Sequence, residues 1–175
     1  MSIRAFKQQQ PDIGKDVYVD ESAQIIGRVE IGQNSSIWPN TTIRGDVNWI
    51  KIGACTSIQD GSVLHVTHDN SDKHPGGFPL SIGSQVTVGH NVVLHGCTIE
   101  DNCLIGMGAI VLDGAHLEKN VFLAAGALVS PHKRLESGYL YVGSPAKKLR
   151  ALSDEDIAGL QHSADHYVKL KNDYL

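Results

Sequence analysis

Three histidines near the middle of this 175-residue chain lie in short apolar segments and could act together as metal ligands: His65, His90 and His95. Neutral imidazole is the commonest metal ligand in proteins, and three imidazoles with an open fourth position are typical of a catalytic zinc site. A single histidine beside an apolar run is more often a hydrogen-bonded surface or corner residue. The case for a metal site therefore depends on the spacing of the three in the fold that carries them.

An aliphatic residue recurs every six positions along most of the chain. It occurs at Ile13, Val19, Ile25, Ile31, Ile37 and Ile43, then at Ile52, Ile58 and Leu64, then at Ile82, Val88 and Leu94, and finally at Ile99, Ile105, Val111, Leu117, Leu123 and Val129. A period of six fits neither a helix nor an uninterrupted alternating strand. It is typical of a parallel β-helix, in which three hexads close one coil of about 18 residues. A β-sandwich would instead show turns about every 8–12 residues.

The repeat divides the chain into four parts. We expect an N-terminal arm at residues 1–12, a β-helix at 13–130 with a loop inserted at about 66–80, a linking segment at 131–152 and a C-terminal α-helix at 153–175. Ser153 is a suitable helix N-cap, acidic residues follow it, and an apolar stripe then recurs at spacings of three and four. This helix is expected to pack along the β-helix or against a neighbouring subunit.

The spacing of two of the histidines corresponds to one coil. His65 and His95 are 30 residues apart, and removing about 12 residues of extruded loop leaves about 18. Their backbones should then lie about 5 Å apart on one face, as neighbouring strands do. Two ligands of one metal ion are expected to have this arrangement.

The third histidine belongs to an adjoining face, because His90 is only five residues before His95. It cannot easily reach the same point within one prism, but it could reach the equivalent point on a neighbour. We therefore expect a homotrimer with a metal site at each interface, taking His65 and His95 from one chain and His90 from the next. His68 and His74, in the loop, could ligate instead; His116, His132, His162 and His166 are expected to be solvated.

Composition excludes several other classes of protein. The net charge is -4 and the pI is about 6.1, whereas a nucleic-acid binder would show a basic face. The chain has no apolar segment of signal-peptide or membrane-spanning length, so no membrane partner and a cytoplasmic location are expected. The three cysteines Cys55, Cys97 and Cys103 are expected to be free thiols, and a redox role for Cys97 and Cys103 is left open.

Four segments resemble one known family. They are TIRGD (42–46), SIQDGSVLH (57–65), TVGHNVVLHGCTIEDNCLIGMGAIV (87–111) and YVGSPAKKLR (141–150). Together they resemble the gamma-class carbonic anhydrase family, in the shorter bacterial anhydrase-like branch of the hexapeptide-repeat superfamily, over nearly the whole chain. The resemblance implies that the β-helix is left-handed, a hand that the residues alone do not determine and that departs from the usual crossover rule.

The resemblance also implies an activity, the reversible hydration of carbon dioxide to bicarbonate by metal-bound hydroxide. His65, His90 and His95 match the metal ligands, and Gln59 matches an amide that holds the bound water or bicarbonate. Three imidazoles lower the pKa of water on a metal ion from about 15.7 to about 7. Zn²⁺ is the expected metal, with Fe²⁺ and Co²⁺ as alternatives, because all three accept imidazole ligands.

Three charged residues match further positions of the family. Arg44 and Asp60 match a salt bridge across the subunit interface, and Asp46 matches a carboxylate close to the metal. A purely structural role for Arg44 and Asp46 is the alternative, because a trimer needs such pairs whether or not it is catalytic.

The sequence departs from the family pattern where protons would be carried to solvent. Val47 follows Asp46 in place of a glutamate, the loop at 66–80 has no glutamate, and Ser57 replaces an asparagine. His68 or His74 could carry protons instead, because imidazole titrates near neutral pH.

Two other functions fit the same sequence. One is hydrolysis of coenzyme A thioesters or acyl transfer, because this repeat fold also serves acyltransferases and fold alone does not decide function. The other is a non-catalytic metal-binding trimer. The chain has no obvious extended coenzyme-binding tail, which favours carbonic anhydrase activity over coenzyme A thioester chemistry.

Overall fold

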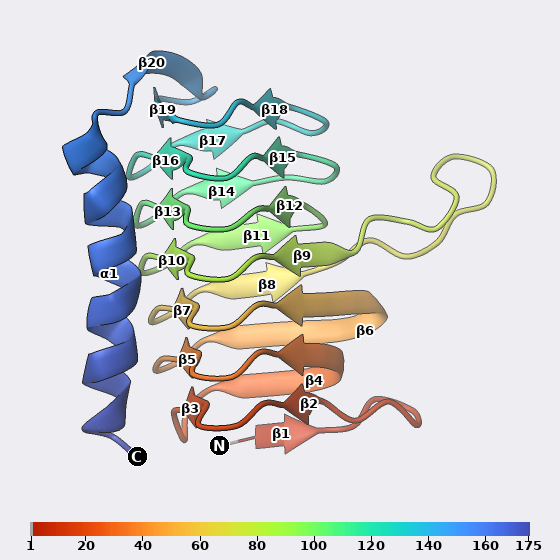
Figure 1. Ribbon diagram of the computed structural model, residues 1–175. Coiled ribbons are helices and arrows are strands. Elements are labelled where there is room, and N and C mark those ends of the chain that lie inside the picture. The colour runs from red at the N-terminus through yellow and green to blue at the C-terminus, as the bar shows by residue number, and fades with distance from the viewer. Residues whose placement is uncertain (1) are drawn as a thin grey trace.

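The computed structural model describes residues 2–175, which form a parallel β-helix with one long α-helix lying along its outside (Figure 1). Almost all strand pairs are parallel and join residues about one coil apart in the sequence. The predicted fold class, a parallel β-helix of hexapeptide repeats with a C-terminal helix, is confirmed. The exception is an antiparallel pair at the C-terminal end of the β-helix.

The strands stack in three columns, one for each face of the prism. One column is β8 (Val63–His65), β11 (Val93–His95), β14 (Ile110–Val111) and β17 (Leu128–Val129), and the next is β9 (Leu80–Ile82), β12 (Thr98–Ile99), β15 (His116–Leu117) and β18 (Arg134–Leu135). The third is β3 (Tyr18–Val19), β5 (Ser36–Ile37), β7 (Ser57–Ile58), β10 (Thr87–Val88), β13 (Leu104–Ile105), β16 (Phe122–Leu123), β19 (Tyr139–Val142) and β20 (Lys147–Ala151). Two longer strands, β4 (Gln24–Ile31) and β6 (Thr42–Ile52), join the first two columns, and β1 (Ser2–Arg4) and β2 (Asp12–Ile13) pair with β4.

The aliphatic position of the hexad fills the interior of the prism. One column of paired residues runs along the whole β-helix: Ile25, Ile43, Leu64, Leu94, Val111 and Val129, all with no exposed surface. Burying each side chain of this kind is worth about 1.5–3 kcal/mol relative to leaving it in water. The six-residue period therefore follows from the need to place one such residue inside on every face.

The β-helix extends beyond residue 130, so the predicted linking segment at 131–152 is wrong over its first part. Leu135 pairs with Leu117, and Tyr141 pairs with Leu123, each about one coil further along the chain. Both side chains are buried in the core. The coil continues because these residues occupy the hexad position. Only then does the chain turn back, in the antiparallel pair of β19 and β20 that closes the end.

Helix α1 (Asp154–Asn172) begins where the sequence predicts. The Ser153 side chain accepts a hydrogen bond from the Asp156 backbone, and the Asp156 side chain accepts one from the Ser153 backbone, forming a capping box. Leu160 and Ala164 are buried where α1 lies along the strands β5, β7 and β10. Within residues 2–175, no helix is long and apolar enough to cross a membrane.

The extruded loop leaves the prism between β8 and β9 (Figure 1). Its base is held by paired backbone hydrogen bonds between Thr67 and Phe78, of 3.0 and 3.1 Å. The buried Asn48 amide donates to the carbonyl groups of Thr67 and Gly76. The loop is therefore anchored to β6, the strand that carries Arg44 and Asp46.

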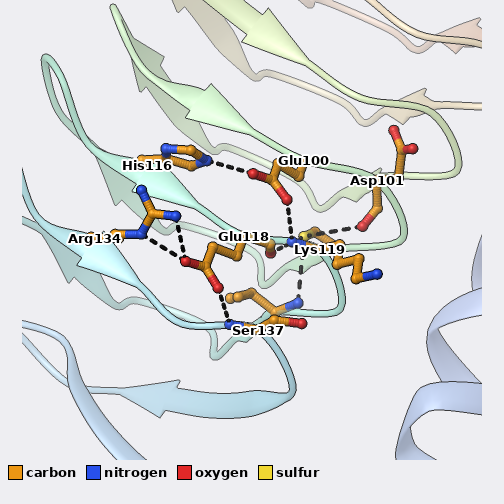
Figure 2. Close-up of polar contacts among 9 residues, drawn as sticks. Glu100, Asp101, His116, Glu118, Lys119, Arg134 and Ser137 are labelled. Atoms are coloured by element: carbon orange, nitrogen blue, oxygen red, sulfur yellow. Dashed lines mark hydrogen bonds and ion pairs between the residues drawn. The ribbon is translucent and has the colours of Figure 1, made fainter.

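A ladder of charged residues lines another corner, the turns that follow β12, β15 and β18 (Figure 2). Glu100 binds the His116 ring at 2.7 Å and accepts the Lys119 backbone N–H, and Glu118 binds Arg134 at 2.6 Å and accepts the Ser137 backbone N–H. Each partner of Glu118 lies 18 residues after the corresponding partner of Glu100. The same polar contact is therefore repeated in successive coils.

The three cysteines are free, as expected. Cys97 and Cys103 are buried, and burial raises the pKa of both thiols, to about 12 for Cys103. Because the thiolate is the reactive form, neither thiol is suited to redox chemistry at neutral pH.

Candidate functional site

His65 and His95 lie directly one above the other. They are paired residues at the ends of β8 and β11, and their ring centroids are 5.1 Å apart. His65 Nδ1 is 3.1 Å from His95 Nε2. The one-coil spacing predicted from the sequence therefore brings two imidazole nitrogens together on one corner of the prism.

Each of these two rings has a carboxylate on its other nitrogen. Asp46 Oδ1 lies 3.0 Å from His65 Nε2, and Asp113 Oδ1 lies 2.6 Å from His95 Nδ1. The four side chains come from four successive coils and form a continuous column in the order Asp46, His65, His95, Asp113. This set is called the two-histidine column below.

The donor set of the column suits a metal ion. If the outer nitrogens donate to the two carboxylates, both inner nitrogens carry lone pairs, and only a proton or a cation can lie between them. Two nitrogens on a tetrahedral zinc ion lie about 3.3 Å apart, from Zn–N distances of about 2.0–2.1 Å. The observed 3.1 Å is close to that value. The carboxylate–histidine arrangement is also the usual support for a metal-binding imidazole.

Strand β6 carries Arg44 and Asp46 on either side of Gly45, beside this column. A Cβ atom at Gly45 would lie 2.5 Å from the Arg28 carbonyl oxygen, so the close approach of β4 and β6 requires glycine. Arg44 donates to Asp46 and forms an ion pair with it. Burial raises the pKa of Asp46, but the hydrogen bonds from Arg44 and His65 outweigh it and bring that pKa below its ordinary value. Asp46 is therefore an ionised acceptor for His65 near neutral pH.

Gln59, Asp60 and His90 lie together on a different corner, in the turns after β7 and β10. His90 Nδ1 is 3.0 Å from Asp60 Oδ2, and the half-exposed His90 ring is accessible to solvent. The buried Gln59 side chain lies beside Tyr167 of α1, and the two residues line the same pocket. Burial raises the pKa of Tyr167, and interaction with Gln59 opposes the rise. Gln59, Asp60, His90 and Tyr167 are called the His90 corner below.

The predicted residues thus separate into two sets within one chain. Within one chain Arg44 pairs with Asp46 and Asp60 pairs with His90, whereas the expected Arg44–Asp60 salt bridge is one between subunits. Across residues 2–175 of a single chain, no three histidine, cysteine, aspartate or glutamate side chains are arranged to hold a metal ion. This separation agrees with the expectation that His90 cannot reach the other two histidines within one prism.

A cavity of about 710 Å³ opens beside Asp46. The residues lining it include Lys7, Arg28, Asp46 and His68. His68 therefore lies near the two-histidine column, whereas His74 packs against Phe78 further out on the loop, with ring centroids 5.0 Å apart. Of the two candidate proton carriers, His68 has the better position.

The sequence interpretation missed three residues that contact the site. Asp113 binds His95, Thr67 donates to Asp113, and Tyr167 contacts Gln59. Asp113 lies 18 residues after His95, so extending the coil period by one more circuit would have identified it. No comparable spacing connects Tyr167 with Gln59, because the helix does not follow the repeat. His116, predicted to be solvated, instead binds Glu100.

Comparisons with known proteins agree with this architecture. The chain matches the bacterial transferase hexapeptide (six repeats) family over residues 11–45, 80–112 and 96–131. The crystal structure of a hexapeptide transferase family protein from Anaplasma phagocytophilum superposes with a TM-score of 0.92 at 40% identity, covering 99% of this chain and 98% of that one. The fold and its repeats thus define the class: a hexapeptide-repeat β-helix protein.

Relatives in sequence narrow the class to one family. The chain is 57% identical over 173 residues to Protein YrdA of Escherichia coli, covering 99% of this chain and 94% of that protein. It is 48% identical over 158 residues to a probable carbonic anhydrase of Methanocaldococcus jannaschii, covering 90% and 94%. It is 46% identical over 160 residues to the mitochondrial gamma carbonic anhydrase 2 of Arabidopsis thaliana, covering 91% of this chain and 57% of that protein. The chain belongs to the gamma-class carbonic anhydrase family.

Proposed function

We propose that the protein is a metal-dependent carbonic anhydrase that hydrates carbon dioxide reversibly to bicarbonate as a homotrimer. The observation that carries the proposal is the pair of facing nitrogens in the two-histidine column, 3.1 Å apart and each backed by a carboxylate. Membership of the gamma-class family supports the choice of reaction.

The division of the site supports the proposed trimer. The two-histidine column offers two imidazoles and the cation Arg44, whereas the His90 corner offers one imidazole, the amide of Gln59 and the anion Asp60. Joining the column of one protomer to the corner of the next supplies three imidazoles and brings Arg44 toward an opposite charge. Threefold symmetry would make the three sites equivalent.

Each part of the site has a chemical task in this proposal. A divalent metal ion held by three imidazoles supplies a hydroxide nucleophile near neutral pH. The Gln59 amide, which lies beside Tyr167, can donate a hydrogen bond to an oxygen of bicarbonate. Arg44 keeps Asp46 ionised, and Asp46 in turn orients the ring of His65. His68 lines the cavity beside Asp46 and is the candidate that passes the released proton to solvent.

The direct test measures metal content and carbon dioxide hydration together. Purified protein should contain about one metal ion per chain, and a chelator should abolish hydration measured by stopped flow. Zn²⁺, Fe²⁺ or Co²⁺ should restore it, and the extent of recovery with each ion identifies the preferred metal. His95→Ala should prevent both metal binding and recovery. A protein that binds metal stoichiometrically and shows no hydration would contradict the proposed activity.

The same samples separate the alternatives. Several structural neighbours carry transferase names, so a panel of coenzyme A thioesters should be assayed with and without metal. Turnover of a thioester without hydration would favour an acyl-transfer or thioesterase function. Stoichiometric metal without turnover in either assay would favour a non-catalytic metal-binding trimer.

A further inference from the structure

Asp113 uses both of its carboxylate oxygens. Oδ1 lies 2.6 Å from Nδ1 of His95, and Oδ2 accepts a hydrogen bond of 2.8 Å from the Thr67 hydroxyl. The carboxylate is about one-third exposed, as is the His95 ring. A group that is held on both sides in this way has little freedom to turn away from His95.

The backbone leaves room for this approach at Gly96. A Cβ atom there would lie 2.3 Å from Asp113 Oδ1, far inside van der Waals contact. Gly96 also donates its N–H to the His65 carbonyl oxygen at 3.0 Å, which ties the two histidine strands together. The absence of a side chain next to His95 is therefore a condition for the Asp113 contact.

The contact determines which nitrogen of His95 is free. A carboxylate accepts hydrogen bonds, so Nδ1 of His95 must carry the proton, and in the neutral ring Nε2 then carries the lone pair. It is this Nε2 that faces His65 Nδ1.

We propose that Asp113 is a positioning residue that holds His95 in the tautomer whose Nε2 is free for the metal, and that Thr67 in turn holds Asp113. This proposal rests on the metal site of the proposed function.

The proposal gives the base of the loop a role at the site. Thr67 pairs with Phe78 across the root of the extruded loop, and its hydroxyl reaches Asp113 two coils away. A shift of the loop root would therefore move the carboxylate that orients His95. On the other side of the column, Arg44 donates a hydrogen bond to Asp46, as Thr67 does to Asp113.

Asp113→Asn tests the proposal, because it keeps the shape and removes the charge and one acceptor oxygen. Metal affinity, measured by competition with a chelator, should fall about 10–100-fold, as is typical when the outer partner of a metal-binding histidine is lost. Nitrogen-15 NMR of histidine-labelled, metal-free protein should show the His95 ring losing its pure Nδ1–H form. The NMR readout does not depend on activity or on bound metal.

Two further variants make the test specific. Glu100→Gln alters another carboxylate–imidazole pair of the same sheet, the 2.7 Å contact with His116, and should leave metal affinity and the His95 signals unchanged. Thr67→Val removes only the hydroxyl that holds Asp113 and should weaken metal binding less than Asp113→Asn, whereas Thr67→Ser should restore it. Because Thr67→Val keeps the Asp113 carboxylate, it can test the proposal if Asp113→Asn does not fold.

The outcomes distinguish this proposal from the proposed function. Wild-type metal affinity and an unchanged His95 tautomer in Asp113→Asn would overturn the positioning role. A wild-type protein without metal affinity would overturn the proposed function, and the NMR signal of His95 would still decide whether Asp113 sets its tautomer.

Discussion

At the scale of single residues, the site depends on short-range contacts that the six-residue repeat positions but does not specify. The period places His65 over His95, yet the hydrogen bonds of Asp46 and Asp113 select which of their nitrogens face each other. The types of residue at these positions were visible in the sequence. The coil period would have paired His95 with Asp113, but the ring nitrogen that each carboxylate contacts was not visible, because it depends on side-chain rotamers.

Gly96→Ala should reduce stability and metal binding more than substitution of another glycine with a positive φ. Gly96 has a φ of +53°, where a side chain costs about 1–2 kcal/mol, and its Cβ would also collide with Asp113 and Phe78. We expect a larger fall in the free energy of unfolding than the φ cost alone and weaker metal binding, measured by denaturant titration and chelator competition.

Gly138→Ala is the matched control. Gly138 also has a positive φ, of +78°, but a Cβ atom there meets nothing within 4 Å. The free energy of unfolding of Gly138→Ala should fall by about 1–2 kcal/mol, and its metal affinity should equal that of wild type. Equal effects of the two substitutions on metal binding would show that the approach of Asp113 to His95 does not matter.

At the scale of elements, the strands were predictable because each hexad must bury one aliphatic residue. The predicted end of the β-helix is too early, because Pro131 suggests the end of the repeat, although Leu135 and Tyr141 continue the six-residue period from Val129. Helix α1 was predictable from its capping box and acidic first turn. Its contact with Gln59 through Tyr167 was not, because the repeat contains no information on how the helix docks.

The corner ladder of Figure 2 predicts how stability depends on acidity. The hydrogen bond with His116, followed by that from the Lys119 backbone, lowers the pKa of Glu100 below its ordinary 4.5. The pKa of Glu118 is also lowered, mainly by the hydrogen bond from the Ser137 backbone N–H and next by that from Arg134. A lowered pKa in the folded state means that the stabilisation is complete above about pH 4.5 and is lost as pH falls through the lower folded value.

Glu100→Gln should therefore be less stable than wild type at neutral pH and should lose less stability on acidification below pH 4.5. Urea unfolding at a series of pH values measures this difference. Glu21→Gln, at an exposed turn, is the control and should follow the wild-type curve. A Glu100→Gln curve parallel to that of wild type would contradict the role of the ladder.

At the scale of the whole molecule, one chain places the two-histidine column and the His90 corner on different corners of the prism, and the proposed function makes them two halves of one site. Spacing predicted this division, because one coil separates His65 from His95 while five residues place His90 on the adjoining face. The structure of a single chain agrees, because His90 contacts Asp60 whereas His65 and His95 face each other. Assembly of a trimer is what would make the halves meet.

Subunit mixing tests this central claim most directly. His90→Ala lacks the corner ligand, and the double variant His65→Ala/His95→Ala lacks both column ligands, so neither trimer alone should bind metal or hydrate carbon dioxide. When the two are co-expressed with different tags and hybrid trimers are isolated, one interface in each hybrid has an intact column facing an intact corner. The account predicts that the hybrids regain bound metal and hydration activity. Hybrids that stay metal-free and inactive, or a His90→Ala protein that binds metal as tightly as wild type, would contradict it.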